Sequence, residues 1–301
     1  MSQPFEAFLR RLDRARSMRS VALMGVCNVT PDSFSDGGRY FDAAAARTRV
    51  DELVAHGADI VDIGGESTRP GAAAVPAGEQ LARVLDSVRY AVSIGACVSI
   101  DTASPQVALA CLEAGACAVN DASCLRDDAL AKVVADRRAA LILMHARGTQ
   151  EKMLGFSQYP DAGYGDVLHD VLREWGAAAE RARAAGVPPD AIAMDPGLGF
   201  AKNARQSAEL LARLGEIVRS LDVPVVVGAS RKSFLTIADA GAEPTERVGA
   251  SIAAALYAAR AGASIVRVHD VRITRQAIDF SRQLARYLPS SGEVSAGPGG
   301  A

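Results

Sequence analysis

Short apolar runs alternate with longer amphipathic segments through most of this 301-residue chain. Eight apolar runs of strand length lie at residues 21–26, 59–63, 97–100, 118–120, 139–144, 191–194, 223–227 and 264–268. One segment with helical periodicity follows each run, at residues 43–56, 78–93, 105–114, 127–135, 164–185, 205–221, 245–261 and 274–288. Strands that alternate with helices of this length predict βαβ units and a parallel sheet.

The two kinds of junction differ in length and chemistry. Four helix-to-strand junctions are short and contain a glycine suited to a left-handed helix cap, namely Gly57, Gly115, Gly186 and Gly262. The strand-to-helix junctions are longer and polar, an asymmetry typical of a (β/α)8 barrel. We therefore predict the α/β class, with one TIM barrel over residues 21–288. A doubly wound open sheet is the alternative, but no glycine-rich dinucleotide motif follows the first strand.

The ends of the chain read differently from the barrel. Residues 1–20 predict a surface helix or arm outside the core, as an N-terminal extension. Residues 289–301 are rich in Ser, Gly and Pro, which predicts a flexible, disordered tail. No apolar segment follows the first arginines in the manner of a secretory signal.

Composition excludes several kinds of partner. The net charge is −2 and no apolar run approaches the roughly 20 residues of a membrane span, so we expect neither nucleic acid nor a membrane as partner. The five cysteines are odd in number and form no CxxC pair, which favours reduced core thiols and a cytoplasmic location.

The first strand runs directly into a polar loop. Asn28, Thr30 and Asp36 follow the apolar run, and Pro31 prevents a central strand from continuing. Every later strand end also carries polar or charged residues: Glu66 to Arg69, Asp101, Asn120 and Asp121, His145 and Arg147, Asp195 and Lys202, Ser230 to Ser233, and Arg267 to Asp270. A single Asp there can be a helix cap, but eight such ends predict one convergent rim.

These motifs resemble those of the dihydropteroate synthase family. The matching segments are Asn28-Val-Thr-Pro-Asp-Ser-Phe-Ser-Asp-Gly-Gly38, Gly64-Gly-Glu-Ser-Thr-Arg-Pro-Gly71, Asp195-Pro-Gly-Leu-Gly-Phe200, Ser230-Arg-Lys232 and Arg267-Val-His-Asp270. They follow the family's order over about residues 21–288. The resemblance implies condensation of 6-hydroxymethyl-7,8-dihydropterin pyrophosphate with p-aminobenzoate, which gives 7,8-dihydropteroate and pyrophosphate for folate synthesis.

The resemblance also implies three subsites. Those expected to bind the pterin are Asp101, Asn120, Met144, Asp195, Lys232 and Arg267. Those expected to bind pyrophosphate are Asn28, Thr68, Arg69, Arg267 and His269, with Mg²⁺ as cofactor and Asn28 as its protein ligand. Those expected to bind p-aminobenzoate are Phe34, Thr68, Pro70, Phe200, Lys232 and Ser233.

The implied chemistry concerns the leaving group more than the nucleophile. The family resemblance assigns catalytic roles to Asn28, Asp36, Lys232, Arg267 and His269, with Asp36 near the cation that develops on the pterin methylene. Cys27 has no activating partner in the sequence, so we expect no covalent nucleophile. We interpret His145 as structural, and His56 and His169 as residues of helix surfaces.

Some positions depart from the family pattern. Cys124 stands where glycine is usual, and the fifth loop has Ala146 and Gln150 where the family has Met and Pro. A methyltetrahydrofolate-corrinoid methyltransferase, a non-catalytic pterin-binding paralogue and a structural protein stay open as alternatives. The resemblance further implies sulfonamide inhibitors and a homodimer, for which the Ala-rich helix at residues 250–261 is a candidate face.

Overall fold

Eight parallel strands form a nearly closed barrel in the computed structural model, which describes residues 3–30, 43–67, 74–149 and 159–287. The strands are β1 (Ala22–Asn28), β2 (Ile60–Gly64), β3 (Val98–Asp101), β4 (Ala118–Asp121), β5 (Ala140–Met144), β6 (Ile192–Asp195), β7 (Val226–Val227) and β8 (Ile265–Val268). Their order is β6-β5-β4-β3-β2-β1-β8-β7, and a bridge between Met194 and Val225 joins the two ends. The predicted TIM barrel is confirmed.

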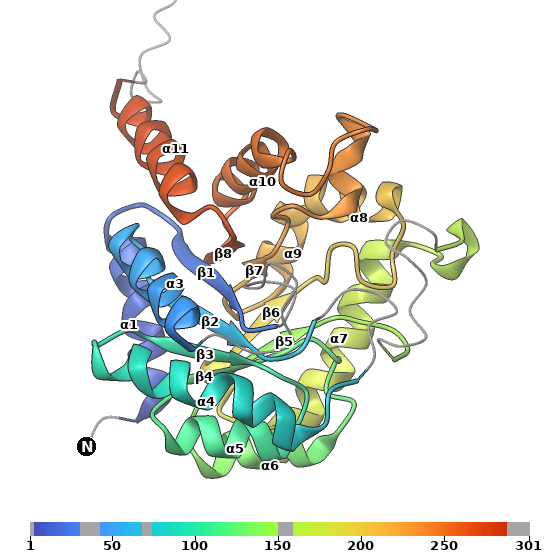
Figure 1. Cartoon of the computed structure of the whole chain (residues 1–301). Helices are drawn as coiled ribbons and strands as arrows, with labels where there is room; N and C mark the ends of the chain where they lie inside the picture. Colours follow the sequence, from blue (N-terminus) through green and yellow to red (C-terminus); the bar gives the residue numbers. More distant parts are fainter. Residues whose placement is uncertain (1–2, 31–42, 68–73, 150–158, 288–301) are drawn as a thin grey trace, which may run out of the picture.

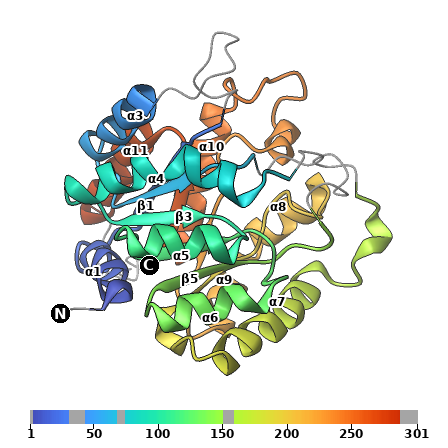
Figure 2. The ribbon, with the colours of Figure 1, turned by 60° about the horizontal axis from the view of Figure 1, so that its bottom comes forward.

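Helices surround the strands on the outside of the barrel (Figures 1 and 2). They are α1 (Pro4–Ser17), α3 (Ala43–Ala55), α4 (Ala77–Ser93), α5 (Pro105–Glu113), α6 (Asp128–Asp136), α7 (Val167–Ala184), α8 (Ala204–Ala212), α9 (Leu214–Ser220), α10 (Val248–Arg260) and α11 (Val271–Leu284). Short 3-10 helices lie at η2 (Asp161–Gly163), η3 (Pro189–Ala191), η4 (Ser233–Ile237) and η5 (Ala285–Tyr287).

Most predicted helices differ from the observed ones by a few residues at their ends, and two differences have a clear structural cause. The segment 205–221 is divided at Arg213, whose φ of −93° and ψ of 14° interrupt the helix between α8 and α9. The last helix begins three residues earlier than predicted, at Val271, because Val271 and Thr274 belong to its buried face together with Ile278.

The first helix belongs to the core, so the prediction that residues 1–20 lie outside it is wrong. Phe8, Leu12 and Ala15 of α1 are buried, and they join a cluster with inward-facing strand residues such as Met24 and Ile142. Their spacing of three or four residues places them on one face of the helix. Burial of a side chain the size of Phe8 or Leu12 stabilises the fold by roughly 1.5–3 kcal/mol.

The helix-to-strand turns have the expected backbone. Gly57, Gly115, Gly186 and Gly262 have φ of +90°, +105°, +100° and +99°, which is the left-handed conformation that glycine favours. Because these turns lead from a helix into the next strand, they lie at the amino ends of the strands. The long polar loops are therefore all at the opposite end.

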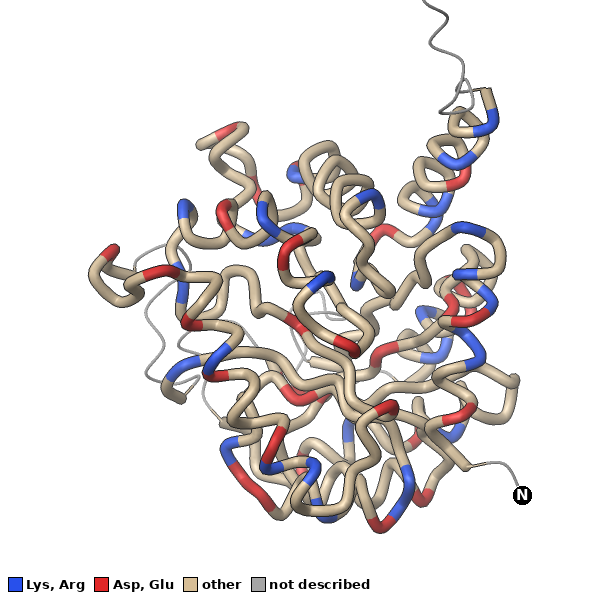
Figure 3. The backbone as a smooth tube through the Cα atoms, turned by 180° about the vertical axis from the view of Figure 1, so that it is seen from behind, with Lys and Arg blue, Asp and Glu red and all other residues tan. Residues whose placement is uncertain are grey.

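Three features of the described residues relate to composition, namely the state of the cysteines, the apolarity of the helices and the distribution of charge. The five cysteines are free thiols, and all but Cys124 are buried. Of the helices described, none is both long and apolar enough to cross a membrane. Figure 3 shows basic and acidic residues interspersed along the backbone, in keeping with the net charge of −2.

Candidate active site

Arg267 links three strand ends at the carboxyl side of the barrel. It lies on β8, and its Nε donates to Asp62 Oδ2 on β2 at 2.7 Å. Its Nη2 donates to Asp101 Oδ2 on β3, also at 2.7 Å. Asn120 on β4 donates from Nδ2 to the same Asp62 oxygen at 3.1 Å. The predicted convergence of Asp101, Asn120 and Arg267 is thus present.

The carboxyl groups of Asp62 and Asp101 are buried away from water. Asp62 is 0% exposed and Asp101 is 7% exposed. Burial raises the pKa of Asp101 to about 7, although the charge of Arg267 opposes the rise. One oxygen of Asp62, Oδ1, is buried and has no hydrogen-bond partner among the residues that the structure describes. Because such an acceptor is costly when unsatisfied, a bound donor or water would stabilise it.

A second group surrounds Gly228, in the loop after β7. A Cβ added there would lie 3.7 Å from Lys232 Nζ, 3.8 Å from Asp195 Oδ2 and 3.8 Å from Arg267 Cβ. Three predicted site residues therefore approach one point, where a Cβ would make ordinary van der Waals contact with all three. Burial lowers the pKa of Lys232 to about 8, with Asp195 opposing the change. Burial likewise raises the pKa of Asp195.

The loop after β6 closes one side of this group. Lys232 Nζ donates to the Leu198 carbonyl at 2.7 Å and lies 4.5 Å from the centre of the Phe200 ring. Phe200 is 7% exposed and shares an apolar cluster with Met144 at the end of β5. Both residues were predicted to contact ligands, and the structure places Phe200 beside the lysine and Met144 against Phe200.

The end of β8 also carries His269. Its Nδ1 lies 3.1 Å from Ser230 Oγ, and its backbone N–H donates to the same hydroxyl at 3.2 Å. Burial and the nearby guanidinium groups of Arg267 and Arg231 lower the pKa of His269 to about 3. The imidazole is therefore neutral at ordinary pH. A Ser230 hydroxyl that donates to Nδ1 would leave the proton on Nε2, free to donate to an anion.

The remaining predicted residues fall into two sets. Asn28 is the half-buried last residue of β1, where it pairs with Gly64 of β2. Ser233 opens the short helix η4 directly after Lys232. The other predicted site residues lie outside the part of the chain that the structure describes: Phe34, Asp36, Thr68, Arg69 and Pro70.

The structure adds three residues to which the sequence analysis assigned no subsite. Asp62 interrupts the apolar run 59–63, and a charged residue in a buried strand is a signal because it needs a partner. Lys202 is 0% exposed and follows the loop after β6. His145 lies between Lys202 and Glu174, so it is structural as predicted, but it also supports the site. His169 is exposed and His56 half-buried at the end of α3.

The departure at Cys124 has a backbone consequence. Cys124 and Leu125 have φ of +60° and +53°, in the left-handed region where the family's glycine is favoured. Asp121 holds this turn, accepting from the Ser123 N–H at 2.9 Å and the Leu125 N–H at 2.6 Å. Asp121 therefore stabilises the left-handed turn after β4 although the turn contains no glycine.

In the part of the chain that the structure describes, the rim offers few side chains that could bind a metal ion. Within the described ranges, no three His, Cys, Asp or Glu side chains group closely enough to hold a metal by themselves. Asn28 offers one amide oxygen at the rim. Mg²⁺ commonly takes one or two protein ligands and completes its shell with water and substrate phosphates, so a single oxygen here fits it.

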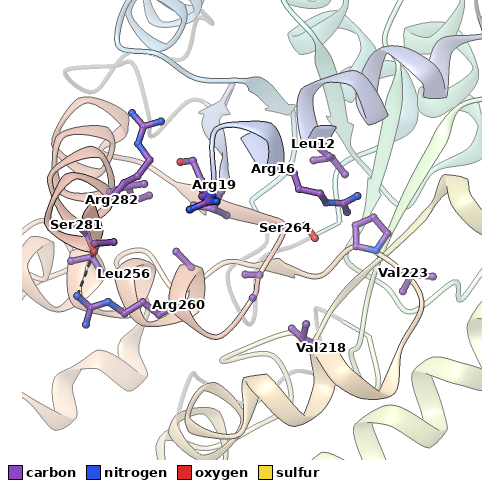
Figure 4. Close-up of a pocket in the computed structure, with 18 of the residues that line it drawn as sticks. Leu12, Arg16, Arg19, Val218, Val223, Leu256, Arg260, Ser264, Ser281 and Arg282 are labelled. Carbon is purple, nitrogen blue, oxygen red and sulfur yellow. Dashed lines mark hydrogen bonds between the residues drawn. The ribbon is translucent and has the colours of Figure 1, made fainter. Parts of the chain in front are cut away.

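A cavity of about 1080 Å³ opens at the other side of the structure, among α1, α9, α10 and α11 (Figure 4). Leu12, Arg19, Val218 and Arg282 are among its lining residues. It lies by the amino ends of the strands, where residues of a barrel serve stability more often than catalysis. The candidate active site is therefore the polar rim and not this cavity.

Comparison with known proteins identifies the family of the chain. A family model described as pterin binding enzyme matches residues 24–269. The dihydropteroate synthase of Mycobacterium leprae is 43% identical over 268 residues, covering 87% of this chain and 93% of that protein. The synthase of Synechocystis is 41% identical, covering 84% and 86%. The chain spans only 32% of a probable bifunctional folylpolyglutamate synthase/dihydropteroate synthase of Haloferax volcanii, to which it is 39% identical.

Solved structures show the same relationship. The dihydropteroate synthase of Xanthomonas albilineans with 4-aminobenzoic acid superimposes with a TM-score of 0.82 at 39% identity, covering 90% of this chain and 95% of that one. The Yersinia pestis synthase in a sulfonamide drug complex superimposes with a TM-score of 0.81 at 36% identity, covering 90% and 96%.

Proposed function

Because the chain belongs to the pterin binding enzymes, we propose that it is a dihydropteroate synthase. The reaction joins 6-hydroxymethyl-7,8-dihydropterin pyrophosphate to p-aminobenzoate and releases pyrophosphate. One observation carries the proposal: Asp101, Asn120, Asp195, Lys232 and Arg267, the residues that the family motifs assign to the pterin, meet at one end of the barrel. The methyltransferase and structural-protein alternatives are set aside because the synthase relatives cover most of the chain.

The pterin subsite follows from hydrogen-bonding chemistry. An aminopyrimidinone edge presents adjacent donors and acceptors, and a buried ring must have them satisfied. Asp195 supplies acceptors and Asn120 supplies both an acceptor and donors. Arg267 is held by Asp62 and Asp101, so its planar guanidinium keeps one orientation for stacking on the ring. Lys232, with a pKa of about 8, is mostly protonated at neutral pH and can donate.

The pyrophosphate subsite is proposed at the ends of β1 and β8. Arg267 supplies positive charge, and neutral His269 supplies an N–H donor. Asn28 would hold Mg²⁺, which when bound neutralises charge on the leaving pyrophosphate. Thr68 and Arg69 are proposed to complete this subsite from outside the described residues.

The p-aminobenzoate subsite is proposed between the loops after β6 and β7. Phe200 offers a ring face and Lys232 and Ser233 offer donors suited to the aminobenzoate. Phe34, Thr68 and Pro70 are proposed to close it from outside the described residues.

Bond changes in this site are simple. The amine nitrogen of p-aminobenzoate forms a bond to the pterin methylene carbon as the carbon–oxygen bond to pyrophosphate breaks. Pyrophosphate leaves with the electron pair and the amine loses one proton. The negative charge that develops on the departing pyrophosphate makes the main contribution to the barrier. Donors at Arg267 and His269 stabilise this charge. Asp36 is proposed to stabilise positive charge on the pterin methylene.

We also propose that the protein is a homodimer and that it is cytoplasmic. Tyr257 on α10 is 48% exposed, and Phe280 and Leu284 on α11 are 64% and 49% exposed. These side chains support a homodimer through α10 and α11, although Ala254, Ala255 and Ala258 of the Ala-rich helix face inward. Free thiols support a cytoplasmic location, since reducing compartments preserve them.

Pyrophosphate release tests the proposed function. Purified protein is mixed with the pterin pyrophosphate and Mg²⁺, with and without p-aminobenzoate, and pyrophosphate is measured by a coupled assay. We expect release that depends on p-aminobenzoate and that sulfonamides inhibit competitively. Tight pterin binding with no turnover would instead identify a non-catalytic pterin-binding paralogue.

A further inference from the structure

Lys202 is a fully buried lysine whose ammonium group is completely matched by acceptors. Its Nζ lies 3.0 Å from the Phe200 carbonyl oxygen, 3.1 Å from that of Gly197 and 2.9 Å from His145 Nδ1. An ammonium group has three N–H donors, so the three nearest acceptors take one each, and the His145 carbonyl oxygen is a more distant fourth acceptor at 3.5 Å. A neutral amine would leave one buried acceptor without a donor.

His145 connects this lysine to helix α7. Its Nε2 lies 3.0 Å from Glu174 Oε2, and Arg147 Nε donates to the same carboxylate oxygen at 2.8 Å. Burial lowers the pKa of His145 to about 4, so the ring is neutral. With Nδ1 accepting from Lys202, the ring proton lies on Nε2 and is donated to Glu174. The acceptor for Lys202 is thereby fixed in its tautomer.

The contacts of Lys202 hold the loop that follows β6. Gly197 in this loop has φ of +67°, and a Cβ there would lie 2.0 Å from the His145 carbonyl oxygen. The Tyr164 hydroxyl donates to the Ala201 carbonyl at 3.0 Å, which gives the loop a second anchor. The Leu198 carbonyl of the same loop accepts from Lys232.

We propose that Lys202 is a positioning residue, whose ammonium fixes the loop 196–201 so that the loop holds Lys232 and the Phe200 ring in their working places. This rests on the proposed function, because that function gives Lys232 its role. The sequence carries a matching signal. Lysine occurs four times among 33 basic residues, at Lys132, Lys152, Lys202 and Lys232.

Arginine, the common cation of this chain, does not suit the Lys202 position. Its planar guanidinium carries five donors in a fixed fork, whereas the three acceptors here surround a compact ammonium. Lys202→Arg is therefore expected to behave as a defective variant and not as a conservative one.

Titration of Lys232 tests the proposal apart from turnover. Amine-reactive labelling over a pH series, read by mass spectrometry, gives the pKa of Lys232, with exposed Lys132 as internal reference. Two variants are compared with wild type: Lys202→Met, and Tyr164→Phe, which changes no charge. A released loop admits water to Lys232, so we expect its pKa to rise in both variants, by about one unit in Lys202→Met. We also expect KM for p-aminobenzoate to rise at least fivefold in Lys202→Met.

The outcomes separate positioning from other roles. An unchanged Lys232 pKa in both folded variants would overturn the proposal. A rise in Lys202→Met alone would also overturn it, because loss of a neighbouring charge explains that result. The expected shifts in a protein without synthase turnover would support the positioning role while rejecting the proposed function. Lys202→Arg keeps the charge but does not suit the three contacts, so a raised Lys232 pKa in that variant keeps the test open should Lys202→Met not fold. Lys132→Met serves as the matched control for KM, which should stay at the wild-type value.

Discussion

Asp62→Asn is the change that tests the organisation of the rim most sharply. The variant keeps the size of the side chain but removes its charge. Its amide oxygen can still accept from Arg267 Nε and Asn120 Nδ2, which both donate to Asp62 Oδ2, and its amide nitrogen then occupies the position of Oδ1. Removing one partner of a buried ion pair costs about 3–5 kcal/mol. Asp101 still binds the other guanidinium nitrogen, so we expect the free energy of unfolding to fall by a smaller amount, about 2–3 kcal/mol.

The same change is expected to reduce catalysis. The hydrogen bond from Arg267 Nε to residue 62 would lose its charge, so Asp101 would hold the stronger contact and the plane of the guanidinium would be less firmly fixed. We expect kcat/KM to fall between about tenfold and about a hundredfold, equal to roughly 1.4–2.8 kcal/mol of transition-state stabilisation. Urea unfolding gives the stability change, and the pyrophosphate assay gives the kinetics.

Asp59→Asn provides a matched control at the amino end of the barrel. Asp59 Oδ2 accepts from the Leu23 N–H at 2.8 Å and pairs with Arg275. This variant should lose stability but keep kcat/KM. If Asp62→Asn also loses stability while its kcat/KM stays within about twofold of wild type, Asp62 is only structural and the reasoning on Arg267 is refuted.

Three further predictions follow from the same contacts. Lys232→Ala and Asp195→Ala should each lower kcat/KM at least about tenfold, and near-wild-type steady-state kinetics in both would reject the pterin-site assignment. Gly197→Ala should destabilise the fold by about 2 kcal/mol or more in urea unfolding, because its Cβ would overlap the His145 carbonyl; wild-type stability would contradict that geometry. The pKa of His145 is lowered from 6.5 to about 4, so the unfolded chain binds more protons in that range. As the pH is lowered from 6.5 to 4, the free energy of unfolding should therefore fall in wild type by up to roughly 3 kcal/mol more than in His145→Gln. Parallel curves of unfolding free energy against pH would disprove this prediction.

The barrel and most of its rim follow from patterns that the sequence carries directly. Glycines at helix ends and polar residues at strand ends are local features, so the direction of the barrel and the convergence of Asp101, Asn120 and Arg267 are predictable from them. The role of α1 was missed because a short amphipathic helix looks the same on a surface as it does over a barrel end. Only the contact of Phe8 with strand residues distinguishes the two.

The supporting residues were harder to predict because their roles depend on partners distant in sequence. Asp62 on β2 meets Arg267 on β8, on the far side of β1, and Lys202 meets His145 from a separate loop. Neither pair has a spacing that a motif records. A charged residue in an apolar strand and a rare lysine in an arginine-rich chain are the signals that point to them.

Calorimetric titration of the pterin pyrophosphate into the wild-type protein and Asp195→Ala tests most directly the claim that the strand-end rim is a pterin site. We predict saturable binding to wild type and binding at least about tenfold weaker to the variant, equal to roughly 1.4 kcal/mol. Equal affinity in two folded proteins, or no binding to wild type, would contradict the claim.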